Sequence, residues 1–294
     1  MGNVFSFALT AALARKTGAS ILLRIDDLDR DRAQDVYVQD IFDTLRFMGI
    51  PWDEGPEDVA AFERSWSQVH RMELYRRTLA SLRSVGAVFA CSCSRADVIR
   101  ATVGRVPKSE GHRRSDGRAG GCVAGCRELE LSLEPAGVSW RLPTGDIARG
   151  LSVKTVGGGR IDAVLPDEMR EMVVRKKDGF PAYQLTSLAD DVYYGVDLIV
   201  RGNDLWPSTL AQHCLSYPLE AAGFRDIAFY HHTLLLGDGG GKLSKSSGDT
   251  SIRFLRQSGL TPADIYSLIL RKLGIEGEVN GWEELVVMLG PGLL

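Results

Sequence analysis

Aliphatic runs alternate along this chain with segments whose apolar residues recur at helical spacing. Residues 19–25 (ASILLRI) form one such run, and they lie between helical patterns at residues 3–18 and 36–49. The alternation returns over residues 182–237, where two aliphatic runs (VDLIVRG and DIAFYHHTLLLG) each follow a helical pattern. Strands that alternate with helices pair in parallel through helical crossovers, so the pattern predicts an α/β fold built on a parallel sheet.

Local signals predict where several helices begin and end. Asn3 is expected to cap the first helix, and Gly18 to end it, because these residue types suit the two ends of a helix. Residues 61–86 carry apolar side chains at helical spacing and predict one long helix. Beyond residue 250 the pattern is helical only, so a short helical region is expected there.

Composition limits the kind of protein that this chain can be. With 294 residues, 44% of them hydrophobic, it can bury a substantial core. No apolar run approaches the roughly 20 residues that cross a bilayer, and the first residues lack a signal-peptide pattern, which predicts a cytoplasmic location. The formal net charge is −3, so a nucleic-acid partner requires a local basic patch.

Residues 91–160 interrupt the alternation and carry four of the five cysteines. This segment is rich in Gly, Arg and Ser and predicts a small inserted domain. Thiols stay reduced inside cells, where a cysteine cluster is usually a metal site, and four thiolates suit tetrahedral zinc. The expected ligands of one structural Zn²⁺ are Cys91, Cys93, Cys122 and Cys126.

A glycine-rich loop, GDGGGKLSKSSGD at residues 237–249, follows the last aliphatic run. It is not a phosphate-binding P-loop, because the first required glycine is Leu236 and the required Ser or Thr is Leu243. It can be a solvated polar linker with two incidental lysines. Alternatively, it is a mobile loop that brings Lys242 and Lys245 to a negatively charged transition state.

The segment Lys242–Ser246 (KLSKS) resembles the KMSKS signature of class I aminoacyl-tRNA synthetases. Three further stretches resemble the catalytic core of glutamyl-tRNA synthetases: NVFSFALTAALARKTGASILLRIDDLDRDR, GIPWDEGP, and RKKDGFPAYQLTSLADDVYYGVDLIVRGNDLWPSTLAQ. Together they cover most of the chain. The resemblance implies a Rossmann-like parallel sheet and four parts: a first half of the catalytic domain at 1–90, an inserted acceptor-binding domain at 91–160, a second half at 161–236, and the loop with helices at 237–294.

The resemblance also implies an activity and its residues. The chain would activate L-glutamate with ATP and Mg²⁺ to glutamyl-adenylate. Lys242 and Lys245 would be catalytic by stabilising the phosphates. The ATP-binding set would be Gly2, Asn3, Lys242, Leu243, Ser244, Lys245 and Ser246. The glutamate-binding set would be Asp26, Tyr183 and Arg201, of which Asp26 is more often Glu in the family.

Within this family the chain is most similar to the short glutamyl-queuosine tRNA(Asp) synthetases. Only a short stretch follows Ser246, where full synthetases carry an anticodon-binding region, and the short enzymes have a C-x-C…Y-x-x-x-C zinc motif. Here cysteine stands at the tyrosine position. The implied partner is tRNA(Asp) carrying queuosine, and the implied state is a monomer without membrane contact. A truncated glutamyl-tRNA synthetase that charges tRNA(Glu) is the alternative.

One family feature is missing from the sequence as given. The family begins with a strand of the type R-F/L-A-P-[ST]-P-[ST]-G and a signature histidine, and the chain begins after them. Either the start codon lies further upstream, or the chain is a truncated, inactive form. The inactive form would be a zinc-stabilised RNA-binding protein, and its basic loop would then be either an RNA contact or a solvated loop. This loop holds Arg95, Arg100, Arg105, Lys108, Arg113, Arg114 and Arg118.

Overall fold

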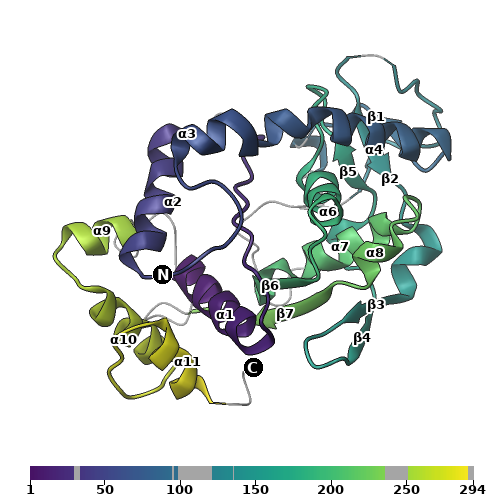
Figure 1. Ribbon diagram of the computed structural model, residues 1–294. Helices are drawn as coiled ribbons and strands as arrows, with labels where there is room; N and C mark the ends of the chain where they lie inside the picture. Colours follow the sequence, from purple (N-terminus) through teal and green to yellow (C-terminus); the bar gives the residue numbers. More distant parts are fainter. Residues whose placement is uncertain (30–33, 95, 99–120, 135, 236–250, 291–294) are drawn as a thin grey trace. The chain divides into compact units, whose positions relative to one another are not determined.

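The computed structural model describes residues 1–29, 34–94, 96–98, 121–134, 136–235 and 251–290. Its contacts divide the chain into two compact units, each described by itself below. The first unit comprises Met1–Arg71, Ile199–Asp204 and Tyr230–Leu294. The second comprises Met72–Leu198 and Leu205–Phe229. Figure 1 shows the helices and strands along the chain.

The first unit begins with helix α1, Gly2–Thr17, whose buried residues between Val4 and Ala14 are all apolar and lie on every side of the helix. Gly18 ends the helix as predicted: it adopts φ 70°, and its N–H donates to the carbonyl of Ala14. The prediction that Asn3 caps α1 is wrong. The helix begins two residues earlier than that prediction requires, with Met1 at the cap position, so Asn3 lies inside the first turn.

The aliphatic run at residues 19–25 does not form the expected continuous strand among the described residues. It makes a single parallel bridge, between Leu22 and Glu54, in which Leu23 N–H donates to the Glu54 carbonyl over 2.9 Å. Gly55 must be glycine here, because it adopts φ 118° and a Cβ would lie 2.5 Å from the Leu23 carbonyl oxygen. Strand β6, Leu198–Gly202, pairs with strand β7, Ala228–His232, in a two-stranded sheet.

The predicted long helix at 61–86 is broken into short pieces. Its early part is helix α3 (Val59–Ala61), a π-helical turn (Phe62–Trp66) and a 3₁₀ turn (Gln68–Arg71). Ser67 leaves the helical conformation, with ψ 142°. The cause is the fully buried carboxylate of Asp27, which accepts from the Ser67 hydroxyl and, over 2.7 Å, from Gln68 N–H. Satisfying a buried charge outweighs continuing the helix.

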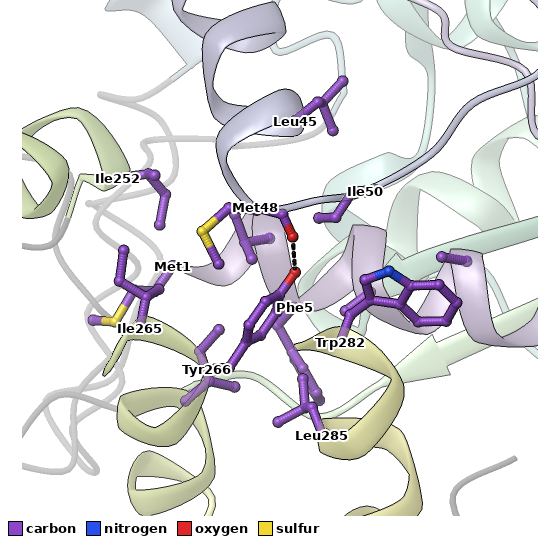
Figure 2. Close-up of a cluster of buried hydrophobic side chains, with 14 of the residues drawn as sticks. Met1, Phe5, Leu45, Met48, Ile50, Ile252, Ile265, Tyr266, Trp282 and Leu285 are labelled. Atoms are coloured by element: carbon purple, nitrogen blue, oxygen red, sulfur yellow. Dashed lines mark hydrogen bonds between the residues drawn. The ribbon is translucent and has the colours of Figure 1, made fainter. Parts of the chain in front are cut away.

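The remaining helices of the first unit form its main apolar core (Figure 2). They are α2 (Asp35–Phe47), α9 (Ile252–Gln257), α10 (Pro262–Lys272) and α11 (Trp282–Leu289). Tyr266 in α10 is fully buried, and its hydroxyl donates to the Met48 carbonyl over 2.8 Å. The expected helical region beyond residue 250 is confirmed.

Replacing Tyr266 with phenylalanine is expected to destabilise the first unit by about 1–2 kcal/mol, because the Met48 carbonyl stays buried without its donor. The urea unfolding midpoint measures this loss. Tyr37→Phe is the matched control, since Tyr37 is 56% exposed and should change the midpoint little. Equal midpoints for the two variants would contradict the role of the buried hydrogen bond.

The second unit contains an antiparallel sheet with the order β1-β2-β5. Its strands are β1 (Phe89–Cys91), β2 (Ser139–Leu142) and β5 (Met172–Arg175). A hairpin adds β3 (Leu151–Lys154) and β4 (Arg160–Ala163), and the helices are α4 (Met72–Ser84), α6 (Tyr183–Tyr193), α7 (Trp206–Ser216) and α8 (Ala222–Arg225). Helices α6 and α7 pack together (Figure 1).

Three further 3₁₀ turns connect these elements, at Gly145–Arg149, Asp167–Met169 and Asn203–Leu205. In the part of the chain that the structure describes, no helix is long and apolar enough to span a bilayer.

Candidate metal centre and predicted substrate residues

The structure brings the four predicted metal ligands together at one end of β1. The Sγ atoms of the four cysteines, 91, 93, 122 and 126, all lie within 4.8 Å of one another. Cys93 Sγ is 3.7 Å from Cys122 Sγ and 3.8 Å from Cys126 Sγ. Zinc bound tetrahedrally at about 2.3 Å from each thiolate separates the sulfurs by roughly 3.8 Å. The donor set and its spacing therefore fit a structural Zn²⁺.

The surroundings of the cluster shift the pKa values of its thiols in different directions. Burial raises the pKa of Cys91, and it raises the pKa of Cys122 to about 12. Burial acts in the same direction on Cys126, but hydrogen bonds, first from Ser92, outweigh it and lower the pKa of Cys126 to about 6. Zinc binding must therefore displace protons from the raised thiols, which makes its affinity fall as pH falls.

Hydrogen-bond donors surround the sulfurs. Cys126 N–H donates to Cys122 Sγ over 3.3 Å, and Ser92 Oγ lies 3.7 Å from Cys126 Sγ. Such donors favour thiolate over thiol, which is the form that a metal requires.

The residues predicted to bind glutamate occur in both units. Arg201 lies in β6 of the first unit and is 8% exposed. Asp26, also in the first unit, is exposed and pairs with Arg24, whose Nε lies 2.9 Å from Asp26 Oδ1. Tyr183 is the first residue of α6 in the second unit and is 43% exposed. Their roles toward glutamate remain predictions.

The residues predicted to bind ATP are described only in part. Gly2 and Asn3 are exposed in the first turn of α1, where backbone N–H groups and the helix dipole favour an anion. Lys242, Leu243, Ser244, Lys245 and Ser246 lie outside the described residues, as do the seven basic residues of the loop between Cys93 and Cys122.

Two histidines beside Arg201 escaped prediction from the sequence. His231 Nδ1 lies 3.3 Å from the Gly202 carbonyl, and His232 Nε2 lies 2.6 Å from Ser6 Oγ. Burial lowers the pKa of His231 to about 4, with the nearby Arg201 guanidinium acting in the same direction, and burial also lowers the pKa of His232. The sequence shows His231 and His232 next to each other in an aliphatic run, but it does not indicate that they contact Gly202 and Ser6.

This burial predicts a loss of stability in mild acid. Below pH 6.5 an unfolded chain protonates its histidines, whereas folded His231 stays neutral down to about pH 4. Stability should therefore fall as pH drops through this window, by on the order of 1–3 kcal/mol for His231. Urea midpoints at pH 7.5 and 5.0 measure the fall. His231→Gln should reduce it and the exposed His70→Gln should not; an unchanged fall in His231→Gln would contradict this origin.

Comparison with known proteins places the chain in a family. The family model described as tRNA synthetases class I (E and Q), catalytic domain, matches residues 1–290. The chain belongs to this family of class I synthetase catalytic domains. The expected α/β class is confirmed as a mixed α/β fold, in which the β1-β2-β5 sheet and the β3-β4 hairpin are antiparallel.

Individual relatives carry two different names at similar identity. Glutamate--tRNA ligase 2 of Acidithiobacillus ferrooxidans is 31% identical over 284 residues, which cover 92% of this chain and 55% of that protein. Glutamyl-Q tRNA(Asp) synthetase of Nitratidesulfovibrio vulgaris is 32% identical over 277 residues, which cover 94% and 82%. The chain thus spans about half the length of the first relative and most of the second.

A solved structure supports the fold alone. Glutamate-tRNA synthetase from Elizabethkingia anophelis superposes with a TM-score of 0.68 at 21% identity, over 97% of this chain and 62% of that chain.

Proposed function

We propose that the chain activates L-glutamate with ATP and Mg²⁺ and transfers the glutamyl group to the queuosine base of tRNA(Asp). In the first step the glutamate carboxylate attacks the α-phosphate, forming glutamyl-adenylate and releasing pyrophosphate. In the second step the base displaces AMP. Family membership over residues 1–290 supports the first step, because these enzymes act on glutamate or glutamine.

The four-cysteine cluster is the observation that carries the choice of tRNA(Asp). The short glutamyl-queuosine enzymes hold zinc with a C-x-C…Y-x-x-x-C motif, and this chain has the same spacing with a fourth thiolate. We assign the inserted domain at 91–160 to the tRNA acceptor and Zn²⁺ to its framework. The four thiolates would hold the ion, which would supply no chemistry to the reaction and would tie the turn of residues 122–126 to the end of β1.

The chain's own residues divide the remaining work. The ammonium groups of Lys242 and Lys245 offset charge that grows on the phosphates, and the first turn of α1 at Gly2 and Asn3 presents N–H groups to them. The guanidinium of Arg201 grips the substrate carboxylate, while Tyr183 and Asp26 hold its other polar groups. This division needs no nucleophilic side chain.

Arg201→Lys is expected to raise the KM for glutamate about tenfold or more, because an ammonium group cannot hold both carboxylate oxygens as a guanidinium does. The KM for ATP should change little, and pyrophosphate exchange at varied glutamate and ATP measures both. Arg175→Lys, in β5 of the second unit, is the control. A normal KM for glutamate in Arg201→Lys would remove Arg201 from the site.

Glutamate-dependent pyrophosphate exchange, followed by transfer of labelled glutamate, tests the proposed function. Exchange without tRNA, and transfer to tRNA(Asp) only when it carries queuosine, are expected. A second candidate, charging of tRNA(Glu), is favoured by relatives named glutamate--tRNA ligase at 31% and 34% identity. Exchange that needs tRNA(Glu) would establish it instead. No exchange under any condition would support an inactive RNA-binding protein.

A further inference from the structure

Beyond the four thiols, a buried arginine lies against the metal centre. Arg141 in β2 is 8% exposed, and its guanidinium lies beside the Cys91 thiol. A register shift between Trp140 and Arg141 interrupts the pairing of β2 with β5. The extra residue of this irregularity is Val174 of β5, so β2 itself runs on without an insertion. Arg141 pairs with Phe89 of β1, two positions along from the pair of Ser139 with Cys91, and therefore lies on the same face of the sheet as that pair.

The guanidinium of Arg141 is only partly satisfied within the described residues. Its Nη1 donates to the Glu171 carbonyl over 2.9 Å, while its buried Nε–H has no hydrogen-bond acceptor there. A buried charged donor without an acceptor is costly. A metal-bound thiolate is a far better acceptor than a thiol, so metal binding at Cys91 would supply negative charge where Arg141 needs it.

Glu171 connects Arg141 to Cys122, another cysteine of the cluster. Its carboxylate Oε2 accepts from Cys122 N–H over 2.6 Å, while its carbonyl accepts from Arg141. Glu171 adopts φ 49°, a left-handed conformation that is uncommon for a residue with a side chain. Gly121, directly before Cys122, adopts φ 99°. The backbone at Cys122 is therefore fixed in two ways: Gly121 before it adopts a positive φ, and its own N–H is bound by the Glu171 carboxylate. Glu171 in turn holds an unfavourable backbone conformation, which is typical of residues at functional sites.

We propose that Arg141 and Glu171 form the outer coordination shell of the zinc site. Four thiolates and one Zn²⁺ carry a net charge of −2 in a largely buried site, and Arg141 is the buried cation that offsets part of it. Glu171 is a positioning residue: it fixes the Cys122 turn through its carboxylate and Arg141 through its carbonyl. The inference rests on the proposed zinc site and not on the choice of tRNA.

Zinc affinity of the full chain, measured by competition with a chromogenic chelator, tests this shell. Glu171→Gly removes the carboxylate but relieves the left-handed backbone, so the metal-free protein should be at least as stable as the unsubstituted one. Its zinc affinity should nevertheless fall about tenfold or more. Glu171→Gln keeps an acceptor oxygen and should recover part of the affinity. Glu134→Gln, an exposed carboxylate paired with Arg83 in the same unit, is the control.

The role of Arg141 is tested by substitutions that remove or keep its positive charge. Arg141→Met should lower zinc affinity about tenfold or more, Arg141→Lys should lower it less, and the visible absorption of Co²⁺ bound to the cluster should shift in Arg141→Met. If Arg141→Met does not fold, the zinc affinity of Glu171→Gly alone tests the proposal. Zinc affinity and Co²⁺ spectra that match the unsubstituted chain in both Glu171→Gly and Arg141→Met would overturn the proposal. An unsubstituted chain that binds no zinc would overturn the zinc site as well.

Discussion

We expect the unsubstituted chain to purify with one zinc ion at the four-cysteine cluster and a Cys126→Ser chain to purify without it. Cys126 is buried, and its Sγ lies 3.8 Å from Cys93 Sγ. Its replacement removes one of the four predicted ligands, and a serine hydroxyl does not bind zinc as a thiolate does. Zinc content should fall well below one equivalent, because three thiolates hold the ion less tightly than the four of a structural site, which bind zinc with apparent free energies of about 10–16 kcal/mol.

The same substitution should change how the protein responds to a chelator. EDTA should lower the Tm of the unsubstituted chain and leave that of Cys126→Ser unchanged, since metal that binds only the folded state stabilises it. Cys214→Ser is the matched control: Cys214 is a fully buried thiol of α7 in the same unit, apart from the cluster. It should cost some stability but keep its zinc. One full equivalent of zinc in Cys126→Ser would exclude the cluster as the metal site.

Lys245→Ala is expected to lower the rate of glutamyl-adenylate formation about tenfold or more, which corresponds to roughly 1.4 kcal/mol or more of lost transition-state stabilisation. The reason is chemical: negative charge grows on the departing pyrophosphate, and an ammonium group brought in only at that stage lowers the barrier without tightening ground-state binding. Single-turnover pyrophosphate release should therefore show a lower rate constant at saturating ATP and glutamate.

Two controls separate the loss of this lysine from a loss of folding stability and from a general loss of positive charge. The urea midpoint of Lys245→Ala should match that of the unsubstituted chain. Lys176→Ala, which removes a surface lysine paired with Asp178, should leave the rate unchanged. An unchanged rate in Lys245→Ala would return the loop at 237–249 to the status of a linker.

Local patterns in the sequence predicted the parts of the fold that depend on neighbouring residues. The helices around Val38 and Ile265, and the stop at Gly18, follow from apolar spacing and from the preference of glycine for positive φ. The break at Ser67 did not follow, because its cause is a carboxylate forty residues earlier in the chain, at Asp27.

The sequence by itself determined the ligand set of the metal centre: four cysteines in one reduced segment have few other uses, and the structure gathers their sulfurs within 4.8 Å. Only the tertiary structure decided what surrounds them. Arg141 lies near Cys91 because β2 pairs with β1 in a register that sets Ser139 opposite Cys91 and Arg141 opposite Phe89, and Glu171 reaches Cys122 across 49 positions of the chain. Residue type and spacing specify which atoms can bind a metal, whereas charge compensation and orientation depend on contacts between distant segments that form only when the chain folds.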